Sequence, residues 1–147
     1  LSGEDEVALR NAGAEYGATT GRPRDCGWLD LPALAFAAQR NGMTGLCITK
    51  LDVLAMLPRA FVCTHYADGI LPGRDGFEDA RPVLREIEGW GGPGLLDEVC
   101  RATRREELPA AARRYLDLIE EHVGVAIVLV SLGADRSKTL MLADAFD

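Results

Sequence analysis

The sequence predicts an α/β fold, because short apolar segments with the character of buried strands alternate with segments of helical periodicity. The clearest strand candidates are residues 46–49, 61–66 and 125–130, which are short, apolar and contain β-branched side chains. Residues 31–41 and 109–122 instead repeat apolar side chains at intervals of three and four, as in a helix that packs through one face. We therefore expect helices that cover a sheet.

Both of these helices carry start and stop signals. In the first, Asp30 suits the N-cap, Pro32 suits the first turn, and Gly42 follows the last helical residue. In the second, Pro109 stands at the start and Gly124 follows the end. These signals set the predicted bounds of both helices.

The remaining elements are predicted from weaker patterns. Residues 17–27 contain three glycines and one proline and follow neither the helical nor the strand period, so we expect a loop there. The other expected elements are a helix within residues 1–16, a short helix over 53–57, a helix near 81–87 and a strand over 139–142.

Composition and charge exclude several classes of function. The chain has 147 residues, 48% of them hydrophobic and 27% charged, which is the balance of a single globular region covering residues 1–147. Its formal net charge is −7, so we expect neither nucleic acid nor an anionic membrane surface as a partner. No apolar run approaches the roughly twenty residues of a membrane-spanning helix, and the first residues do not resemble a signal peptide.

The four cysteines indicate a reducing compartment. Cys26, Cys47, Cys63 and Cys100 form no Cys-x-x-Cys pair, so a zinc ribbon is not predicted, and no metal ligands are assigned. Free cysteines within apolar runs behave as small hydrophobic residues rather than as a disulfide framework. We therefore expect a cytoplasmic protein.

The sequence Thr49-Lys50-Leu51-Asp52 directly follows a predicted buried strand. GTP-binding proteins use an Asn/Thr-Lys-x-Asp sequence in this setting to recognise guanine. The carboxylate accepts two parallel hydrogen bonds from N1–H and the 2-amino group, a donor pair that adenine lacks. The lysine stem can lie along the purine while its ammonium group tethers the loop.

An alternative interpretation of this motif is purely structural. A match as short as this one arises by chance roughly one time in a hundred in a chain of this composition. In that case Asp52 is an ordinary helix N-cap beside a solvated Lys50.

The predicted loop also has the composition of an anion receptor. Pro23 moves Arg22 out of the α region, and its fixed φ favours a polyproline twist that would direct Arg22 and Arg24 toward different ligands. Guanidinium groups, threonine hydroxyls and glycine N–H groups all bind anions. The loop lacks the order of a Walker A motif. The alternative is a surface loop with solvated arginines.

A third segment, Ser131-Leu132-Gly133, follows the strand predicted over residues 125–130. In open α/β sheets, ligands bind beyond the carboxyl ends of strands. Segments 49–52 and 131–133 both follow strands, so two loops at one edge of a sheet could enclose a single base.

Taken together, these motifs resemble those of the adenylosuccinate synthetase family. The match follows the family's order in Glu-Tyr-Gly-Ala-Thr-Thr-Gly-Arg-Pro-Arg at 15–24 and Cys-Gly-Trp-Leu-Asp at 26–30, then at 41–42, 46–52, 107–109, 115–116, 119–121 and 130–136. Family enzymes are roughly three times longer, so the resemblance implies the C-terminal third. It also implies the C-terminal part of a mixed, largely parallel sheet flanked by helices, of P-loop-NTPase-like type.

The resemblance further implies a reaction and roles for individual residues. The reaction is the GTP-dependent ligation of IMP and L-aspartate to adenylosuccinate, in which GTP phosphorylates O6 of IMP and the aspartate amine displaces that phosphate. Arg22 is implied to contact IMP and aspartate, and Arg24 the GTP side. The implied aspartate and IMP residues are Ala18, Thr19, Thr20, Gly21, Arg22, Pro23 and Arg24, and the implied GTP residues are Arg24, Lys50, Leu51, Asp52, Ser131, Leu132 and Gly133.

Several features of the family are absent from this sequence or altered in it. Nothing matches the family's glycine-rich phosphate loop, its catalytic Asp and His or its magnesium ligands, so no catalytic residue is assigned and the chain alone is expected to be inactive. Magnesium and a homodimer are expected from the full-length enzyme. Asp25, Leu132, Ala134 and Glu88 replace residues usual in the family. A stand-alone guanine-nucleotide-binding module without ligase activity is the alternative.

Overall fold

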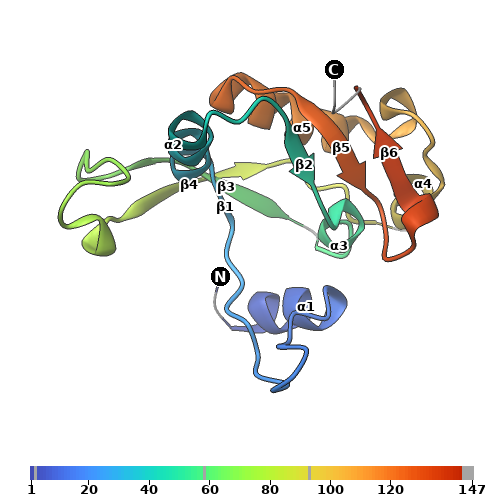
Figure 1. The fold of residues 1–147 in the computed structure, drawn as a ribbon. Coiled ribbons are helices and arrows are strands. Elements are labelled where there is room, and N and C mark those ends of the chain that lie inside the picture. The colour runs from blue at the N-terminus through green and yellow to red at the C-terminus, as the bar shows by residue number, and fades with distance from the viewer. Residues whose placement is uncertain (2, 58, 93, 144–147) are drawn as a thin grey trace.

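Two small mixed sheets form the frame of the molecule (Figure 1). The computed structural model describes residues 1, 3–57, 59–92 and 94–143. The first sheet has the order β1-β3-β4, in which β1 (Leu29–Asp30) runs parallel to β3 (Ala60–Tyr66), and β3 runs antiparallel to β4 (Pro82–Ile87).

The second sheet holds the strands that precede two of the predicted ligand-binding segments. Its order is β2-β5-β6, with β2 (Leu46–Ile48) parallel to β5 (Ile127–Ser131), and β5 antiparallel to β6 (Thr139–Met141). Ile48 pairs with Val130, so both strands end at the same edge. Segments 49–52 and 131–133 therefore leave the sheet side by side, as predicted.

The α/β class is confirmed, although the strands are divided between two sheets instead of forming one. The helices are α1 (Glu4–Ala12), α2 (Leu31–Asn41), α3 (Leu51–Leu54), α4 (Leu95–Arg101) and α5 (Ala110–Val123), with short 3₁₀ turns at Phe77–Asp79, Arg105–Glu107 and Arg136–Lys138. Helix α1 lies apart from both sheets, on the side of α3 (Figure 1).

The core lies between the sheets and the helices that cover them. Helix α5 buries one face, made of Ala111, Ala112, Tyr115, Leu116 and Ile119, as its periodicity predicts. Its side chains join those of both sheets in one apolar cluster. This packing fixes the edge from which the predicted ligand-binding segments leave.

The start and stop signals of α2 act as predicted. The Asp30 side chain accepts a hydrogen bond from the Ala33 amide at 2.9 Å, and Gly42 adopts a left-handed conformation (φ 59°) after the last helical residue. Asp30 also ends β1, so the same residue joins the strand to the helix.

Two predicted elements are corrected by the structure. Residues 82–87 form strand β4, so the helix expected near 81–87 is wrong. This segment pairs along the whole of β3, and the hydrogen bonds of that pairing outweigh a weak local helical pattern. The short helix expected over 53–57 begins earlier and covers Leu51–Leu54.

Within the part of the chain that the structure describes, no helix is both long and apolar enough to cross a bilayer.

Replacement of Asp30 by alanine is expected to lower the free energy of unfolding by about 1–3 kcal/mol. The change removes the cap of α2 and the acceptor of the Tyr66 hydroxyl, whose oxygen lies 2.6 and 2.7 Å from the two carboxylate oxygens of Asp30. Urea unfolding measures the difference. Asp75, which is exposed, is the matched control, and its replacement by alanine should change stability by less than about 0.5 kcal/mol. Equal effects of the two substitutions would contradict the stabilising role of the Asp30 carboxylate.

Candidate functional site

The segment after β2 begins α3 in a way that excludes the structural alternative for Asp52. Lys50 occupies the N-cap position with a left-handed backbone (φ 60°, ψ 38°), and no side chain caps the helix. Asp52 lies in the first turn of α3. It is therefore not the N-cap, and its carboxylate does not satisfy the helix amides.

The carboxylate of Asp52 has an unused acceptor. Its Oδ1 atom is buried and has no hydrogen-bond partner among the described residues. Buried polar atoms in proteins are almost always paired, so an orphaned carboxylate oxygen calls for a specific explanation. A ligand that donates hydrogen bonds would supply the missing partner once the groups that cover this oxygen move aside.

Hydrogen bonds within the chain hold the end of β5 and the residues that follow it. The Ser131 hydroxyl donates to the Gly133 carbonyl at 3.0 Å, and the Leu132 amide donates to the Lys138 carbonyl at 2.7 Å. The Leu132 side chain is fully buried in the core cluster. Leu132 can therefore contribute to a ligand site only through its main chain.

Cys100 of α4 lies close to both segments. Its thiol donates to the Leu132 carbonyl at 3.5 Å. Burial raises the pKa of this thiol, and the negative charge of Asp52 raises it further. The thiol thus stays protonated at neutral pH and can serve as a donor to the second segment.

Trp90 supports the first segment from inside the core. Its indole N–H donates to the Leu51 carbonyl at 3.1 Å, and its side chain is only 1% exposed. The ring also packs against Tyr115, with 5.1 Å between ring centroids. The backbone next to Asp52 is therefore held by a rigid aromatic side chain.

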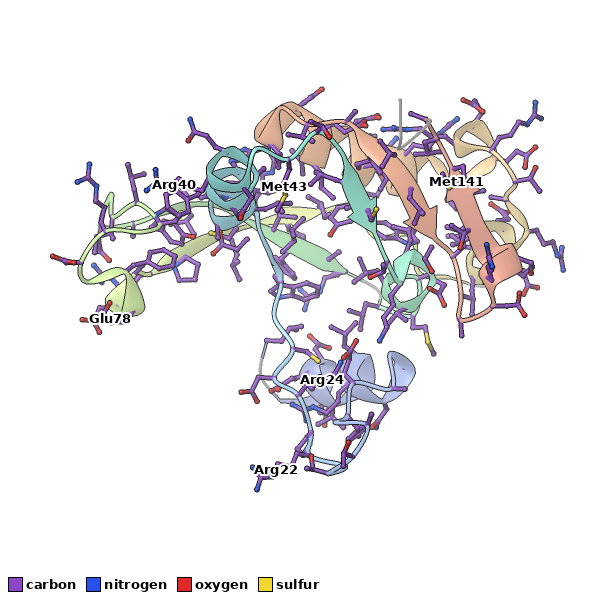
Figure 2. All side chains as sticks on the ribbon, in the orientation of Figure 1. Arg22, Arg24, Arg40, Met43, Glu78 and Met141 are labelled. Atoms are coloured by element: carbon purple, nitrogen blue, oxygen red, sulfur yellow. The ribbon has the colours of Figure 1, made fainter. Side chains whose placement is uncertain are left out.

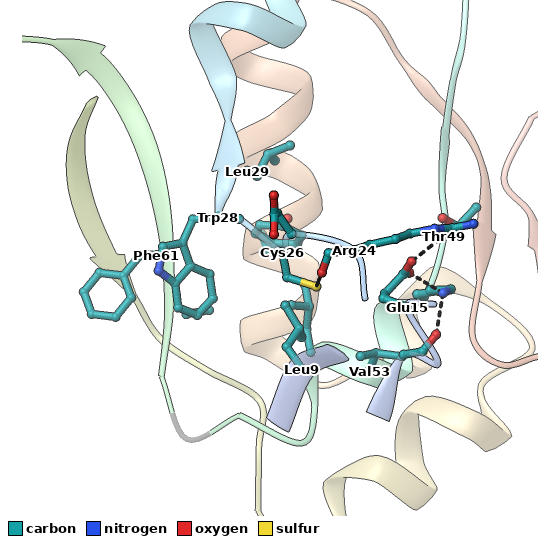
Figure 3. A pocket seen from close by; sticks show the side chains of 16 residues that line it. Leu9, Glu15, Arg24, Cys26, Trp28, Leu29, Thr49, Val53 and Phe61 are labelled. Atoms are coloured by element: carbon teal, nitrogen blue, oxygen red, sulfur yellow. Dashed lines mark hydrogen bonds and ion pairs between the residues drawn. The ribbon is translucent and has the colours of Figure 1, made fainter. Parts of the chain in front are cut away.

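The ammonium group of Lys50 has partners within the chain, although its side chain is exposed. Its ammonium group donates to the Gly13 carbonyl at 2.6 Å and forms an ion pair with Glu15. Glu15 also accepts a hydrogen bond from Nη1 of Arg24 at 2.9 Å (Figure 3). Hydrogen bonds from Lys50 and Arg24 hold the pKa of the Glu15 carboxyl below its ordinary value, so Glu15 is ionised at neutral pH.

The backbone is strained at Lys50 itself and at Ala14, beside the residues that accept its hydrogen bonds. Among the described residues, the non-glycine positions with positive φ are Ala14 (φ 50°) and Lys50 (φ 60°). A left-handed conformation costs a non-glycine residue about 1–2 kcal/mol. Ala14 lies between the two residues that accept from Lys50, so the strain places donor and acceptors opposite each other.

The loop of residues 17–24 is a closed turn with its two arginines pointing apart. Pro23 forms an antiparallel bridge with Tyr16, and the Gly17 amide donates to the Arg22 carbonyl at 2.8 Å. Figure 2 shows Arg22 at the outer end of the loop, directed away from the sheets. Arg24 turns back toward Glu15, so the divergence predicted from Pro23 is present.

A cavity of about 370 Å³ opens where the loop approaches the start of α3. Its lining includes Glu15, Arg24, Trp28, Lys50 and Phe61 (Figure 3). Asp52, Arg22 and the segment after β5 are not part of this lining. The cavity therefore lies between two of the predicted segments, on the Lys50 side, and not on the Asp52 carboxylate.

The described residues do not fit a metal ion. No three of their His, Cys, Asp and Glu side chains converge in a way that could hold one. We therefore assign no step to the magnesium that the resemblance implies.

Comparison with known proteins decides the family. The family model described as adenylosuccinate synthetase matches residues 1–140. The chain belongs to the adenylosuccinate synthetase family. The adenylosuccinate synthetase of Sorangium cellulosum is 44% identical over 150 residues, which cover 99% of this chain and 34% of that protein. That of Thermus thermophilus is 48% identical over 139 residues, which cover 95% of this chain and 32% of the relative.

A solved structure supports the same family. The fully ligated adenylosuccinate synthetase of Plasmodium falciparum matches with a TM-score of 0.83 and 30% identity, over 97% of this chain and 35% of that one. The chain thus spans about a third of the length of the curated synthetases it matches.

The positions where this chain departs from the family pattern differ in their surroundings. Leu132 is buried in the core, so its side chain meets protein atoms. Asp25 is exposed and lines the cavity beside Arg24, where it adds negative charge. Ala134 is exposed in the turn before β6. Of these, Asp25 is the departure that changes the charge around a ligand.

Sequence reasoning did not assign roles to Glu15 and Trp90. Glu15 is part of the family-like motif at 15–24, but its contact lies 35 residues away at Lys50, and no local pattern marks it. Trp90 contacts Leu51 from 39 residues away. Both are visible only once the chain is folded.

Replacement of Glu15 by glutamine is expected to reduce stability at neutral pH but not in acid. Because the folded-state pKa of Glu15 lies below the unfolded value near 4.5, its charge stabilises the fold above that value, and this contribution is lost as pH falls through the folded pKa. The difference between wild type and E15Q, at most about 1 kcal/mol for a partly exposed network, should shrink below pH 4.5. Urea unfolding at pH 7 and pH 3.5 measures it. A difference that stays constant across this range would contradict the assignment.

Proposed function

We propose that this chain carries the guanine-recognition and aspartate-binding segments of an adenylosuccinate synthetase, which ligates IMP and L-aspartate to adenylosuccinate with consumption of GTP. The single observation that carries the proposal is the buried Oδ1 atom of Asp52, which has no partner among the described residues. Family membership supplies the reaction. Magnesium, a cytoplasmic location and homodimeric assembly are part of the proposal and rest on the family alone.

Guanine is the base that suits an unpaired carboxylate. Its N1–H and 2-amino groups form two parallel donors, which the two oxygens of Asp52 can accept. Adenine offers an unprotonated N1 instead, and this would face the carboxylate with a lone pair. The Lys50 stem and the backbone of 131–133 would form the walls, because both segments leave the same edge of the β2–β5 pair.

The loop of residues 17–24 suits anionic ligands. Arg22 is exposed and has its guanidinium group directed outward, so it is available to the carboxylates of aspartate and to IMP (Figure 2). Ala18, Thr19, Thr20 and Gly21 would contribute amides and hydroxyls, all of them exposed. Arg24, held by Glu15, would face the GTP side.

The contribution of these residues is to position ligands and neutralise charge. The bond between the purine carbon and the phosphorylated O6 of IMP breaks when the aspartate amine attacks that carbon. Guanidinium groups beside the aspartate carboxylates and the nucleotide phosphates hold the reactants together and offset their mutual repulsion. We assign no proton transfer to this chain.

Replacement of Asp52 by asparagine is expected to reverse base preference. Loss of a charged hydrogen-bond acceptor is worth about 1.5–3 kcal/mol, so GDP affinity should fall about 10- to 100-fold. The asparagine amide can instead donate to O2 of xanthine, so affinity for xanthosine diphosphate should rise. Calorimetry with the 147-residue chain measures both. Asp75→Asn, at an exposed position outside the cavity, is the matched control and should keep the preference for GDP. Unchanged base preference in D52N would remove the guanine assignment.

The 147-residue chain alone is expected to form no adenylosuccinate when incubated with IMP, L-aspartate, GTP and magnesium. The sequence has no match to the family's glycine-rich phosphate loop, its catalytic Asp and His or its magnesium ligands. The groups expected to activate O6 of IMP and to hold the metal are therefore missing from this chain. Chromatography of the reaction mixture detects the product. Product formation above a no-protein blank would refute this expectation.

A further inference from the structure

Glu15 joins two segments that the sequence separates by more than thirty residues. One carboxylate oxygen, Oε1, pairs with the ammonium group of Lys50, and the other, Oε2, accepts from Arg24 at 2.9 Å. Lys50 opens the segment that contains Asp52, and Arg24 closes the loop of residues 17–24. A single side chain thus contacts both parts of the candidate site at once.

The backbone of Glu15 also makes hydrogen bonds to neighbouring residues. Its amide donates to the Arg10 carbonyl at 2.8 Å, and its carbonyl accepts from the Arg24 amide at 3.0 Å. Arg10 also donates from Nε to the Arg24 carbonyl at 2.7 Å. The Glu15 backbone is thus bonded both to α1 and to Arg24, and its side chain lies between the two cations.

Lys50 is held more tightly than Arg24. The Lys50 ammonium group has a second acceptor, the Gly13 carbonyl at 2.6 Å, whereas Glu15 is the side-chain partner of the Arg24 guanidinium group. The Arg24 side chain is 59% exposed, and that of Lys50 is 46% exposed. Arg24 thus keeps free N–H groups for an anion while Glu15 occupies one of its nitrogens.

The formal charges that line the cavity cancel. Lys50 and Arg24 share the Glu15 carboxylate, and Asp25, which also lines the cavity, adds a second negative charge. The lowered pKa of Glu15 keeps its carboxylate ionised at neutral pH, so one side chain can pair with both cations.

We propose that Glu15 is a positioning residue that couples the guanine segment to the loop of residues 17–24, so that nucleotide bound at one orders the other. This inference rests on the proposed function. A base that packs along the Lys50 stem restricts Lys50, Lys50 fixes Oε1 of Glu15, and Oε2 then holds Arg24 and the end of the loop. Such coupling is reciprocal, so an ordered loop also favours nucleotide binding.

Hydrogen exchange of the 147-residue chain, with and without saturating GDP, tests the coupling. In the wild type, GDP should slow amide exchange both at residues 50–54 and in the loop of residues 17–24. In Glu15→Gln, GDP should still protect residues 50–54, because Asp52 is intact. The loop response should fall at least about fivefold, the lower end of typical coupling between sites. Without GDP, the loop of E15Q should exchange faster than that of the wild type.

Two further variants keep the test decisive. Asp75→Asn removes an exposed carboxylate outside the cluster and the cavity, and its loop should respond to GDP as the wild type does. Glu15→Asp keeps the charge but shortens the reach, so it should lose part of the response. Unchanged protection in α2 and α5 shows in each case that the fold is intact, and E15D replaces E15Q if the latter unfolds.

Three outcomes separate the possibilities. A loop response to GDP in E15Q equal to that of the wild type overturns the coupling, as does a wild-type loop that ignores GDP while residues 50–54 are protected. No protection of residues 50–54 in the wild type shows instead that the proposed guanine site fails, and the coupling falls with it. If GDP still protects residues 50–54 in E15Q but no longer protects the loop, the result supports both the guanine site and the coupling.

Discussion

The contact of Lys50 with Gly13 and Glu15 is the interaction on which the arrangement of the candidate site depends. It connects the first turn of α3 to the segment between α1 and the loop, two parts of the chain that share no strand pairing. Helix α1 lies apart from both sheets (Figure 1), so few other contacts set its position. The Lys50 side chain thus links two parts of the chain that strand pairing does not connect.

The strain at Ala14 and Lys50 is best understood in relation to this contact. Left-handed backbone at a non-glycine residue persists only where surrounding interactions favour it. Here the ion pair and the Gly13 hydrogen bond lie between the two strained positions. The parallel pairing of β2 with β5 fixes the other side of the site, and Trp90 holds the backbone between them.

Elements whose conformation depends on nearby residues could be predicted from the sequence. The caps of α2 and the amphipathic face of α5 follow from residues that are neighbours in the chain. The shared edge of β2 and β5 is a long-range pairing, predicted from the general rule that ligand-binding loops follow the carboxyl ends of strands. Strand β4 was missed because its conformation depends on pairing with β3. The link from Glu15 to Lys50 spans 35 residues and depends on two unusual backbone conformations, which no propensity predicts. The ligand roles of residues 18–24, 50–52 and 131–133 remain predictions.

Burial of the Leu132 side chain has a consequence for how this motif is compared between relatives. The side chain of the residue between Ser131 and Gly133 faces core atoms, and its amide and carbonyl pair with Lys138 and Cys100. Its identity is then governed by the volume available among neighbouring apolar side chains, since any residue supplies the same main chain. A substitution at this position between relatives reflects a change in core packing. It carries little information about which nucleotide the protein selects.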